Sequence, residues 1–200
     1  MLQPIAVDPN SNLDSLIEAL ADAQSIAIGF TQKISTAETG KTVENSQTEY
    51  NFPSHANLIK KLEKIFEIDL RDELAFFSAT GKTGEIFEVP VAADKFAADR
   101  ILLIGLGDES NLAIRQAGAA LGRKGRGKAV TIAAHCVANH SQLKSFAISV
   151  QLGAYIWTQK TGVIQEIPLF IFATDKPDVI ESASTIASAV CQTRDLIHTP

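Results

Sequence analysis

The first place where this sequence could bind a ligand is a short glycine turn. Gly105, Gly107 and Asp108 follow the continuous apolar run 101–104. Backbone N–H groups at a turn between a strand and a helix suit an anion such as phosphate. The dinucleotide fingerprint needs a third glycine, however, where this chain has Ser110, and Asp108 adds a negative charge. We therefore favour a plain strand-to-helix turn and keep anion or nucleotide binding there as the alternative.

Three possible metal ligands, His135, Cys136 and His140, lie close together in the sequence. His and Cys are ordinary zinc ligands. Their spacing crosses from a predicted strand end into a helix start, and no further Cys or His lies near. We interpret these residues as capping or core-packing residues.

Arg194, Asp195 and His198 lie within about one turn of the last predicted helix. An Asp–His pair can orient a catalytic base, but no activated Ser or Cys is identifiable beside it. The sequence also lacks the HExxH, GxSxG and P-loop motifs. The residues alone therefore predict no catalytic, metal-binding or substrate-binding site.

A cationic patch lies after the glycine turn and its helix. Such a patch could meet an acidic partner or nucleic acid, although a solvated helix end, favourable to the helix dipole, is the interpretation we prefer. The formal net charge of −5 also argues against general nucleic-acid binding. The patch consists of Arg123, Lys124, Arg126 and Lys128.

The elements around the glycine turn are a strand and a helix. The run 101–104 does not alternate, which predicts a strand covered on both faces. Apolar residues then recur at mostly helical spacing, with Gly118 the weak point, and Gly122 or Gly125 can close the helix. The first free N–H groups of that helix can be capped by Asp108, Ser110 or Asn111.

The same alternation continues to the end of the chain. Strands are expected at 129–135 and 167–173, and helices at 140–158, ended by residues 160–162, and at 178–198, with Ile197 facing inward. The order β-α-β-α-β-α predicts parallel strands with helices on both faces. The helix at 140–158 is apolar around most of its girth, so other elements or a partner must cover it.

The first half adds further strands, which predicts a mixed sheet. Residues 1–10 read as an edge strand or lead-in, and the polar stretch 31–51 as a long loop, with a weak strand pair left open. Residues 80–84 have hairpin-turn composition, and Pro90 indicates that its strand ends there or lies at a sheet edge. Strands are expected at 25–30, 74–79 and 85–91, and helices at 12–23 and 53–66.

Composition sets the broad class. The chain is 46% hydrophobic and 20% charged, as in ordinary soluble globular proteins. It has no signal segment and no apolar run of about 18 residues, so we expect a cytoplasmic protein without membrane contact. Cys136 and Cys191 are the only cysteines, and we expect two buried thiols rather than a disulfide. We expect one domain.

Three segments resemble the N-terminal domain of the leucyl aminopeptidase (cytosol aminopeptidase) family. DRILLIGLGDESNL at 99–112 resembles that domain's strand with a GLG or GCG turn. LGAYIWTQKTG at 152–162 is similar to the family's Y-x-F-x-x-Y-K region. ASAVCQTRDLIHTP at 187–200 resembles the A-R-D-L-x-N-x-P-x-N segment between the two domains, with His198 where the family commonly has Asn.

This resemblance implies a macro-domain-like three-layer α/β sandwich. It implies that residues 1–198 form a non-catalytic N-terminal domain and that 199–200 begin the linker to a C-terminal catalytic domain. The family's enzymes release N-terminal amino acids, often leucine, from peptides with two divalent metal ions, manganese or zinc, held in the catalytic domain. They also assemble as homohexamers. None of this chain's residues matches a ligand or catalytic position of the family, so no cofactor is expected in this chain.

Three functions remain open at this stage. The first is an assembly or regulatory domain of a metallo-aminopeptidase, inactive by itself, whose partners are its own catalytic domain and further copies. The second is a macro-like module that binds an ADP-ribose-type nucleotide at Gly105 to Asp108. The third is local nucleic-acid binding through Arg123 to Lys128.

Overall fold

The computed structural model describes residues 1–6, 13–35, 47–53, 56–94, 96–137, 139–157 and 166–198. Seven strands and six helices lie within these residues. The strands are β1 (Leu2–Ala6), β2 (Ser25–Ser35), β3 (Gln47–Asn51), β4 (Ile86–Pro90), β5 (Arg100–Gly105), β6 (Thr131–His135) and β7 (Leu169–Thr174). The helices are α1 (Leu13–Leu20), α2 (Ala56–Phe66), α3 (Leu70–Phe76), α4 (Asn111–Gly125), α5 (His140–Ala154) and α6 (Pro177–His198).

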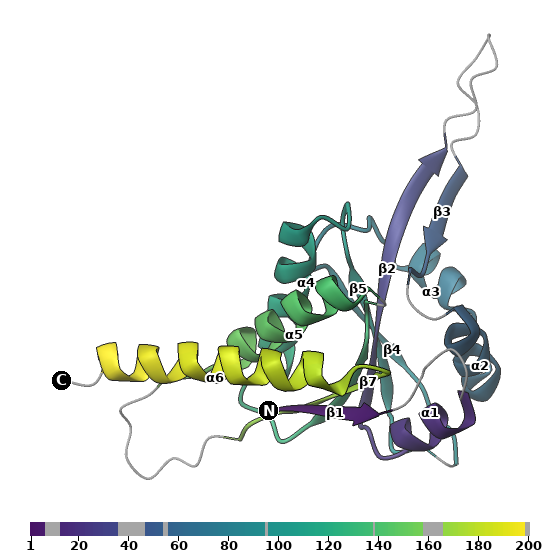
Figure 1. The fold of residues 1–200 in the computed structure, drawn as a ribbon. Coiled ribbons are helices and arrows are strands. Elements are labelled where there is room, and N and C mark those ends of the chain that lie inside the picture. Colours follow the sequence, from purple (N-terminus) through teal and green to yellow (C-terminus); the bar gives the residue numbers. More distant parts are fainter. Residues whose placement is uncertain are drawn as a thin grey trace.

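The strands form one mixed, mostly parallel sheet between two layers of helices (Figure 1). Its order is β1-β7-β6-β2-β5-β4, and β3 pairs with the outer part of β2. Strands β1, β7, β6, β2 and β5 are parallel, whereas β4 and β3 run antiparallel to their neighbours. The predicted α/β class is confirmed, as are the edge positions of β1 and of the strand that ends at Pro90.

The direction of the crossovers explains which helices cover which face. The connection from β1 through α1 to β2 runs across the sheet in one direction, and β5-α4-β6-α5-β7 runs in the other. Because such crossovers are right-handed, reversing the direction puts the helices on opposite faces. Accordingly, α4, α5 and α6 pack on one face and α1, α2 and α3 on the other (Figure 1).

The apolar run 101–104 is buried on both sides, as the sequence predicted. Leu102 and Ile104 join the core under α4, α5 and α6, while Ile101 and Leu103 join the core under α1, α2 and α3. Each of the four side chains is at most 1% exposed. This strand therefore connects the two halves of the molecule.

The prediction of a strand at 74–79 is wrong, because Leu70–Phe76 form helix α3. The Asp69 carboxylate accepts hydrogen bonds from the N–H groups of Arg71 and Asp72, at 2.8 and 3.2 Å, and so caps the helix start. Leu70 and Leu74, four residues apart, bury one helical face. Since α3 precedes residues 80–84, these residues join a helix to β4 and are not a hairpin turn.

The polar stretch 31–51 contains the strand pair that the sequence left open. Strand β2 continues to Ser35, and β3 pairs with it from Gln47 to Asn51. Tyr50 is buried, and its hydroxyl donates to the carbonyl of Ala79 at 2.9 Å. Residues 36–46 lie outside the described part of the chain.

The helix predicted at 140–158 ends earlier, at Ala154, because Tyr155 has an extended ψ of 134°. The proposed helix end at 160–162 and the linker at 199–200 lie outside the described residues. In α6, Ile180, Ala183 and Ala187 face inward, but Ile197, which was predicted to do so, is 74% exposed. The end of α6 extends beyond the sheet, which explains this difference (Figure 1).

Candidate functional site

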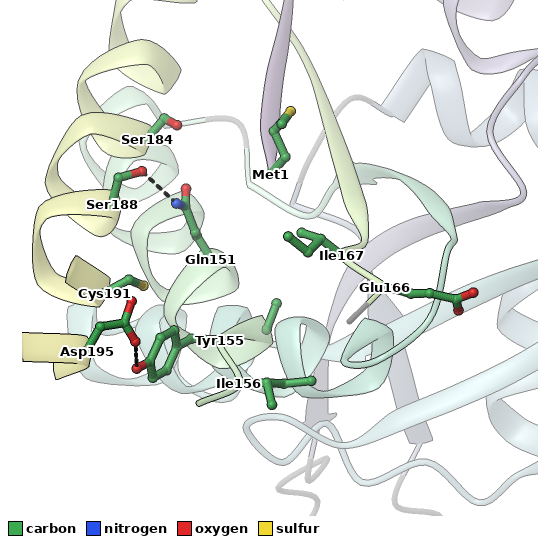
Figure 2. Close-up of a pocket in the computed structure, with 11 residues that line it drawn as sticks. Met1, Gln151, Tyr155, Ile156, Glu166, Ile167, Ser184, Ser188, Cys191 and Asp195 are labelled. Carbon is green, nitrogen blue, oxygen red and sulfur yellow. Dashed lines mark hydrogen bonds between the residues drawn. The ribbon is translucent and has the colours of Figure 1, made fainter. Parts of the chain in front are cut away.

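A cavity of about 470 Å³ lies where the end of α5 meets α6 (Figure 2). On the α5 side it is lined by Gln151, Ala154 and Tyr155, and the remaining wall comes from Met1, Ile156, Glu166 and Ile167. Along α6 the lining residues are spaced by four, three and four positions, which places them on one helical face. These α6 residues are Ser184, Ser188, Cys191 and Asp195.

The carboxamide of Gln151 is the most constrained polar group in this cavity. Its Nε2 donates to the Ser188 hydroxyl at 3.0 Å. Its Oε1 is buried and has no hydrogen-bond partner within the described part of the chain. Figure 2 shows this oxygen pointing into the space between Ser184 and Met1. A buried acceptor left without a donor costs about 1–3 kcal/mol, so this oxygen is suited to a bound hydrogen-bond donor.

Tyr155 and Asp195 close one side of the cavity. The Tyr155 hydroxyl donates to the Asp195 carboxylate, and the Arg194 guanidinium lies 5.7 Å from the centre of the Tyr155 ring. The hydrogen bond to Asp195 raises the pKa of Tyr155 to about 12, so the hydroxyl stays protonated at neutral pH. Asp195 of the predicted Arg194–Asp195–His198 cluster therefore pairs with a tyrosine. The side chain of His198 lies outside the described residues.

The other ionisable groups of the cavity are poorly suited to nucleophilic attack. Cys191 is half-buried, and burial raises the pKa of its thiol, which keeps it protonated and weakly nucleophilic. Burial lowers the pKa of the Met1 ammonium and so favours the neutral amine, but the nitrogen is held by a hydrogen bond that it donates to the Pro168 carbonyl at 2.7 Å. The cavity thus offers hydrogen-bonding groups on an apolar wall, which is an arrangement for binding rather than for covalent catalysis.

The glycine turn that the sequence singled out lies at the end of β5. The N–H of Gly105 donates to the Glu85 carbonyl at 2.8 Å, and that of Gly107 donates to the Gly81 carbonyl at 3.0 Å. A Cβ on Gly105 would stand 2.1 Å from the Lys82 carbonyl oxygen. The chain's own loop therefore fills the space beside the turn and takes up these two N–H groups.

Asp108 and Ser110 both serve the start of α4. The Asp108 carboxylate accepts from the N–H of Ser110 at 3.0 Å, and bonding to Ser110 holds the pKa of Asp108 below its ordinary value. The Ser110 hydroxyl accepts from the N–H of Ala113 at 3.2 Å and is the helix cap, which selects one of the three predicted caps. These bonds are the local ones of a helix N-terminus.

The three possible metal ligands have different surroundings. His135 and Cys136 are buried, and burial raises the pKa of the Cys136 thiol. His140 Nε2 lies 2.8 Å from Asp175 Oδ1 near the surface. Among the residues that the structure describes, no group of three or more His, Cys, Asp and Glu side chains could hold a metal ion.

The basic patch is partly engaged in internal contacts. Lys124 forms an ion pair with Glu88 on β4. Arg126 donates through Nε and Nη2 to the Gly153 carbonyl, at 3.1 and 2.6 Å. These contacts tie the end of α4 to β4 and to α5, so two of the four cations have a structural role.

A smaller cavity of about 200 Å³ lies at the carboxyl ends of β5 and β6, where ligands often bind in α/β sheets. Its polar side chains are engaged locally. Asn139 caps α5 through the N–H of Ser141, and the amide of Gln142 donates to the Glu109 carbonyl at 2.9 Å. The cavity at the end of α5 therefore remains the better candidate for a site.

The sequence had not indicated Gln151, Ser184 or Ser188 as site residues. A signal was present in α6, where polar residues recur at helical spacing from Ser184 to Asp195. That spacing does not reveal which neighbouring element the polar face meets. Only the packing of α5 against α6 brings Gln151 to this face.

Comparison with known proteins gives one family and two similar folds. The model of the cytosol aminopeptidase family, N-terminal domain, matches residues 48–159. The bottromycin maturation enzyme BotP, in complex with Mn, is similar with a TM-score of 0.57 and 19% identity over 89% of this chain and 32% of that chain. A mutant of tomato leucine aminopeptidase is similar with a TM-score of 0.63 and 15% identity over 100% of this chain and 39% of that chain.

Because the sequence identities are low, these two comparisons show only that the folds are similar. This chain spans less than half the length of either structure. No curated protein matches the chain.

Proposed function

This chain belongs to the cytosol aminopeptidase family, and from that premise we propose that residues 1–198 form the N-terminal, non-catalytic domain of a metal-dependent leucyl aminopeptidase. In this proposal the peptide chemistry belongs to a separate C-terminal domain that follows a linker at 199–200. That domain holds the two divalent metal ions, manganese or zinc, and releases N-terminal amino acids from peptides. The N-terminal domain contributes to assembly and regulation. The observation that carries the proposal is the N-terminal-domain match over residues 48–159.

The length of the similar structures supports a second domain. This chain aligns with 39% of the tomato leucine aminopeptidase chain and 32% of the BotP chain. We assign no metal ligand to this chain and place the metal ions of the proposed enzyme in the separate domain, as the resemblance to the family implies.

The free end of α6 supports a contact with that domain. Leu196 and Ile197 are 78% and 74% exposed, on the part of the helix that extends beyond the sheet (Figure 1). Adjacent exposed apolar side chains often mark an interaction surface. We assign Leu196 and Ile197, together called the α6 surface, to the contact with the catalytic domain.

The proposal includes assembly and location. We propose that the complete enzyme is a cytoplasmic homohexamer in which this domain builds subunit contacts and shapes access to the catalytic sites. In the part of this 21.5 kDa chain that the structure describes, no helix is both long and apolar enough to cross a membrane.

The two alternative functions gain no support from the geometry. An ADP-ribose-type nucleotide would need the N–H groups of Gly105 and Gly107, which already donate within the chain. Nucleic-acid binding would need the basic patch, in which Lys124 and Arg126 hold the end of α4 in place. The assembly domain is therefore the function we propose.

The test compares this chain with the polypeptide in which a catalytic domain follows Pro200. Hydrolysis of leucine p-nitroanilide is measured with manganese or zinc added. We expect hydrolysis by the longer polypeptide and none by this chain above a heat-killed control. Hydrolysis by this chain alone, or its absence from the longer polypeptide, would overturn the proposal. Light scattering on the longer polypeptide separately tests the hexamer.

A further inference from the structure

The cavity between α5 and α6 carries polar groups that the proposed function does not use. We propose that it binds a small organic amine, in which a primary amine or ammonium group is attached to an apolar body. The inference rests on three features of the cavity, which are the orientation of the Gln151 amide, the charge of the lining and the apolar wall.

The Gln151 amide presents an acceptor to the cavity. Its Nε2 donates to Ser188 at 3.0 Å, and this bond turns Oε1 away from Ser188, toward the side of the cavity where Ser184 and Met1 lie in Figure 2. This oxygen is buried and has no hydrogen-bond partner among the described residues. A ligand group that donates a hydrogen bond satisfies this oxygen, whereas a carboxylate or phosphate does not.

The charge of the lining favours a cation over an anion. Asp195 and Glu166 line the cavity, and no lysine or arginine does so among the described residues. The Glu166 carboxylate accepts from the N–H of Ala129 at 3.0 Å and points away from Gln151 in Figure 2. The Met1 ammonium is the one cation of the described lining, and it is held by the Pro168 carbonyl. An ammonium ligand therefore meets a lining with more negative than positive groups.

The apolar wall and the volume of the cavity determine the size and the apolar character of the rest of the ligand. Ala154, Ile156 and Ile167 face the cavity beside the Met1 side chain. A volume of about 470 Å³ lies within the range of small-molecule sites, about 300–1,000 Å³. An amine with one aromatic ring or a branched aliphatic chain can place its body on this wall while its nitrogen reaches Gln151.

The position of the cavity suggests a regulatory role. Asp195 lines the cavity and directly precedes Leu196 and Ile197 of the α6 surface. A bound amine therefore lies beside the surface assigned to the catalytic domain, a consequence that rests on the proposed function. Binding itself needs only this chain, so its failure is distinguishable from a failure of the proposed enzyme activity.

The experiment is calorimetric titration of this chain with phenylethylamine at neutral pH. The matched anion is phenylpropionate, which has the same ring and a similar length but ends in a carboxylate. We expect saturable binding of phenylethylamine and binding of phenylpropionate weaker by at least about tenfold. The absence of saturable binding of phenylethylamine up to millimolar concentration, or equal binding of the two probes, would overturn the proposal.

Variants then locate the site. Gln151→Met removes the acceptor and keeps the side-chain length, and we expect it to weaken phenylethylamine binding by about tenfold. Gln142→Met, on the same helix but away from the cavity, is the matched control and should bind as the native chain does. Ser188→Ala, which removes the partner that orients the Gln151 amide, is a second variant in case the first fails to fold. Unchanged binding in a folded Gln151→Met or Ser188→Ala chain would overturn the assignment.

Discussion

The backbone of Gly122 in α4 lies so close to Val150 in α5 that a Cβ on Gly122 would stand 2.1 Å from the Val150 carbonyl oxygen. Two further glycines make the same crossing possible. A Cβ on Gly118 would be 2.6 Å from the Phe146 carbonyl, and one on Gly153 would be 2.4 Å from the carbonyl of Ala119. The two helices thus pack backbone to backbone, and this contact fixes the end of α5 that carries Gln151.

The first prediction concerns this crossing. In an unhindered helix, replacing glycine by alanine stabilises by about 1 kcal/mol. For Gly122→Ala we expect the opposite, a free energy of unfolding lowered by about 1–3 kcal/mol, because the methyl group must push α5 away. Urea denaturation measures this change.

The matched control is Gln116→Ala, an exposed position of α4. It should change the free energy of unfolding by less than about 0.5 kcal/mol. An increase in stability on Gly122→Ala would show that the crossing is looser than the structure indicates.

The helix crossing also shows which features could be predicted from the sequence and which could not. Gly118 was interpreted as a weak point of its helix, since helix propensity is a local property. Its role is to admit the backbone of α5 from another part of the chain, which propensity does not report. The apolar run 101–104 was predictable because a strand buried on both faces leaves a local pattern.

The error at 74–79 has a physical cause. The short apolar stretch LAFFSA fits a strand as well as a helix, because periodicity cannot separate the two over so few residues. The Asp69 cap and the burial of Leu70 and Leu74 favour the helix over a strand.

The candidate site was not predictable for a related reason. It joins Met1, Gln151, Ile167 and Cys191, which only tertiary packing brings together.

The second prediction tests the cap of α3. Asp69→Ala removes the acceptor of the N–H groups of Arg71 and Asp72, and we expect it to lower the free energy of unfolding by about 0.5–2 kcal/mol. Asp69→Asn keeps a capping oxygen and should stay within a few tenths of the native value. Both values come from urea denaturation. An equal loss in the two variants would point to the charge of Asp69 rather than to its cap.

The third prediction concerns acid stability. Hydrogen bonding from Lys124, with Arg100 at 3.0 Å, holds the pKa of Glu88 below its ordinary value of 4.5 in the folded state. A carboxyl group whose pKa is lowered in the folded state stabilises the fold at pH values above its ordinary pKa. This stabilisation is lost as the pH falls through the lowered pKa. Since the Glu88 side chain is 36% exposed, we expect the contribution to be at most about 1 kcal/mol.

The measurement compares the free energy of unfolding at neutral pH and at about pH 3, where glutamates become protonated. Glu88→Gln should lose less stability between these two conditions than the native chain does. Glu18→Gln, at an exposed position of α1, is the control and should follow the native chain. If Glu88→Gln lost as much stability on acidification as the control, the ion pair would have no such role.

The fourth prediction concerns the α6 surface. In this chain, replacing both Leu196 and Ile197 by serine should change the free energy of unfolding by less than about 1 kcal/mol, because both side chains are exposed. Ile180→Ala on the same helix, where the side chain is fully buried, should cost about 2–5 kcal/mol.

In the polypeptide that includes the catalytic domain, the double serine variant should weaken assembly, measured by analytical ultracentrifugation. The exposed polar pair Gln192 and Thr193, also replaced by serine, is the matched control and should assemble normally. Normal assembly of the Leu196 and Ile197 variant would exclude these two residues from the domain contact, because a buried apolar contact cannot lose both side chains without a measurable loss of affinity.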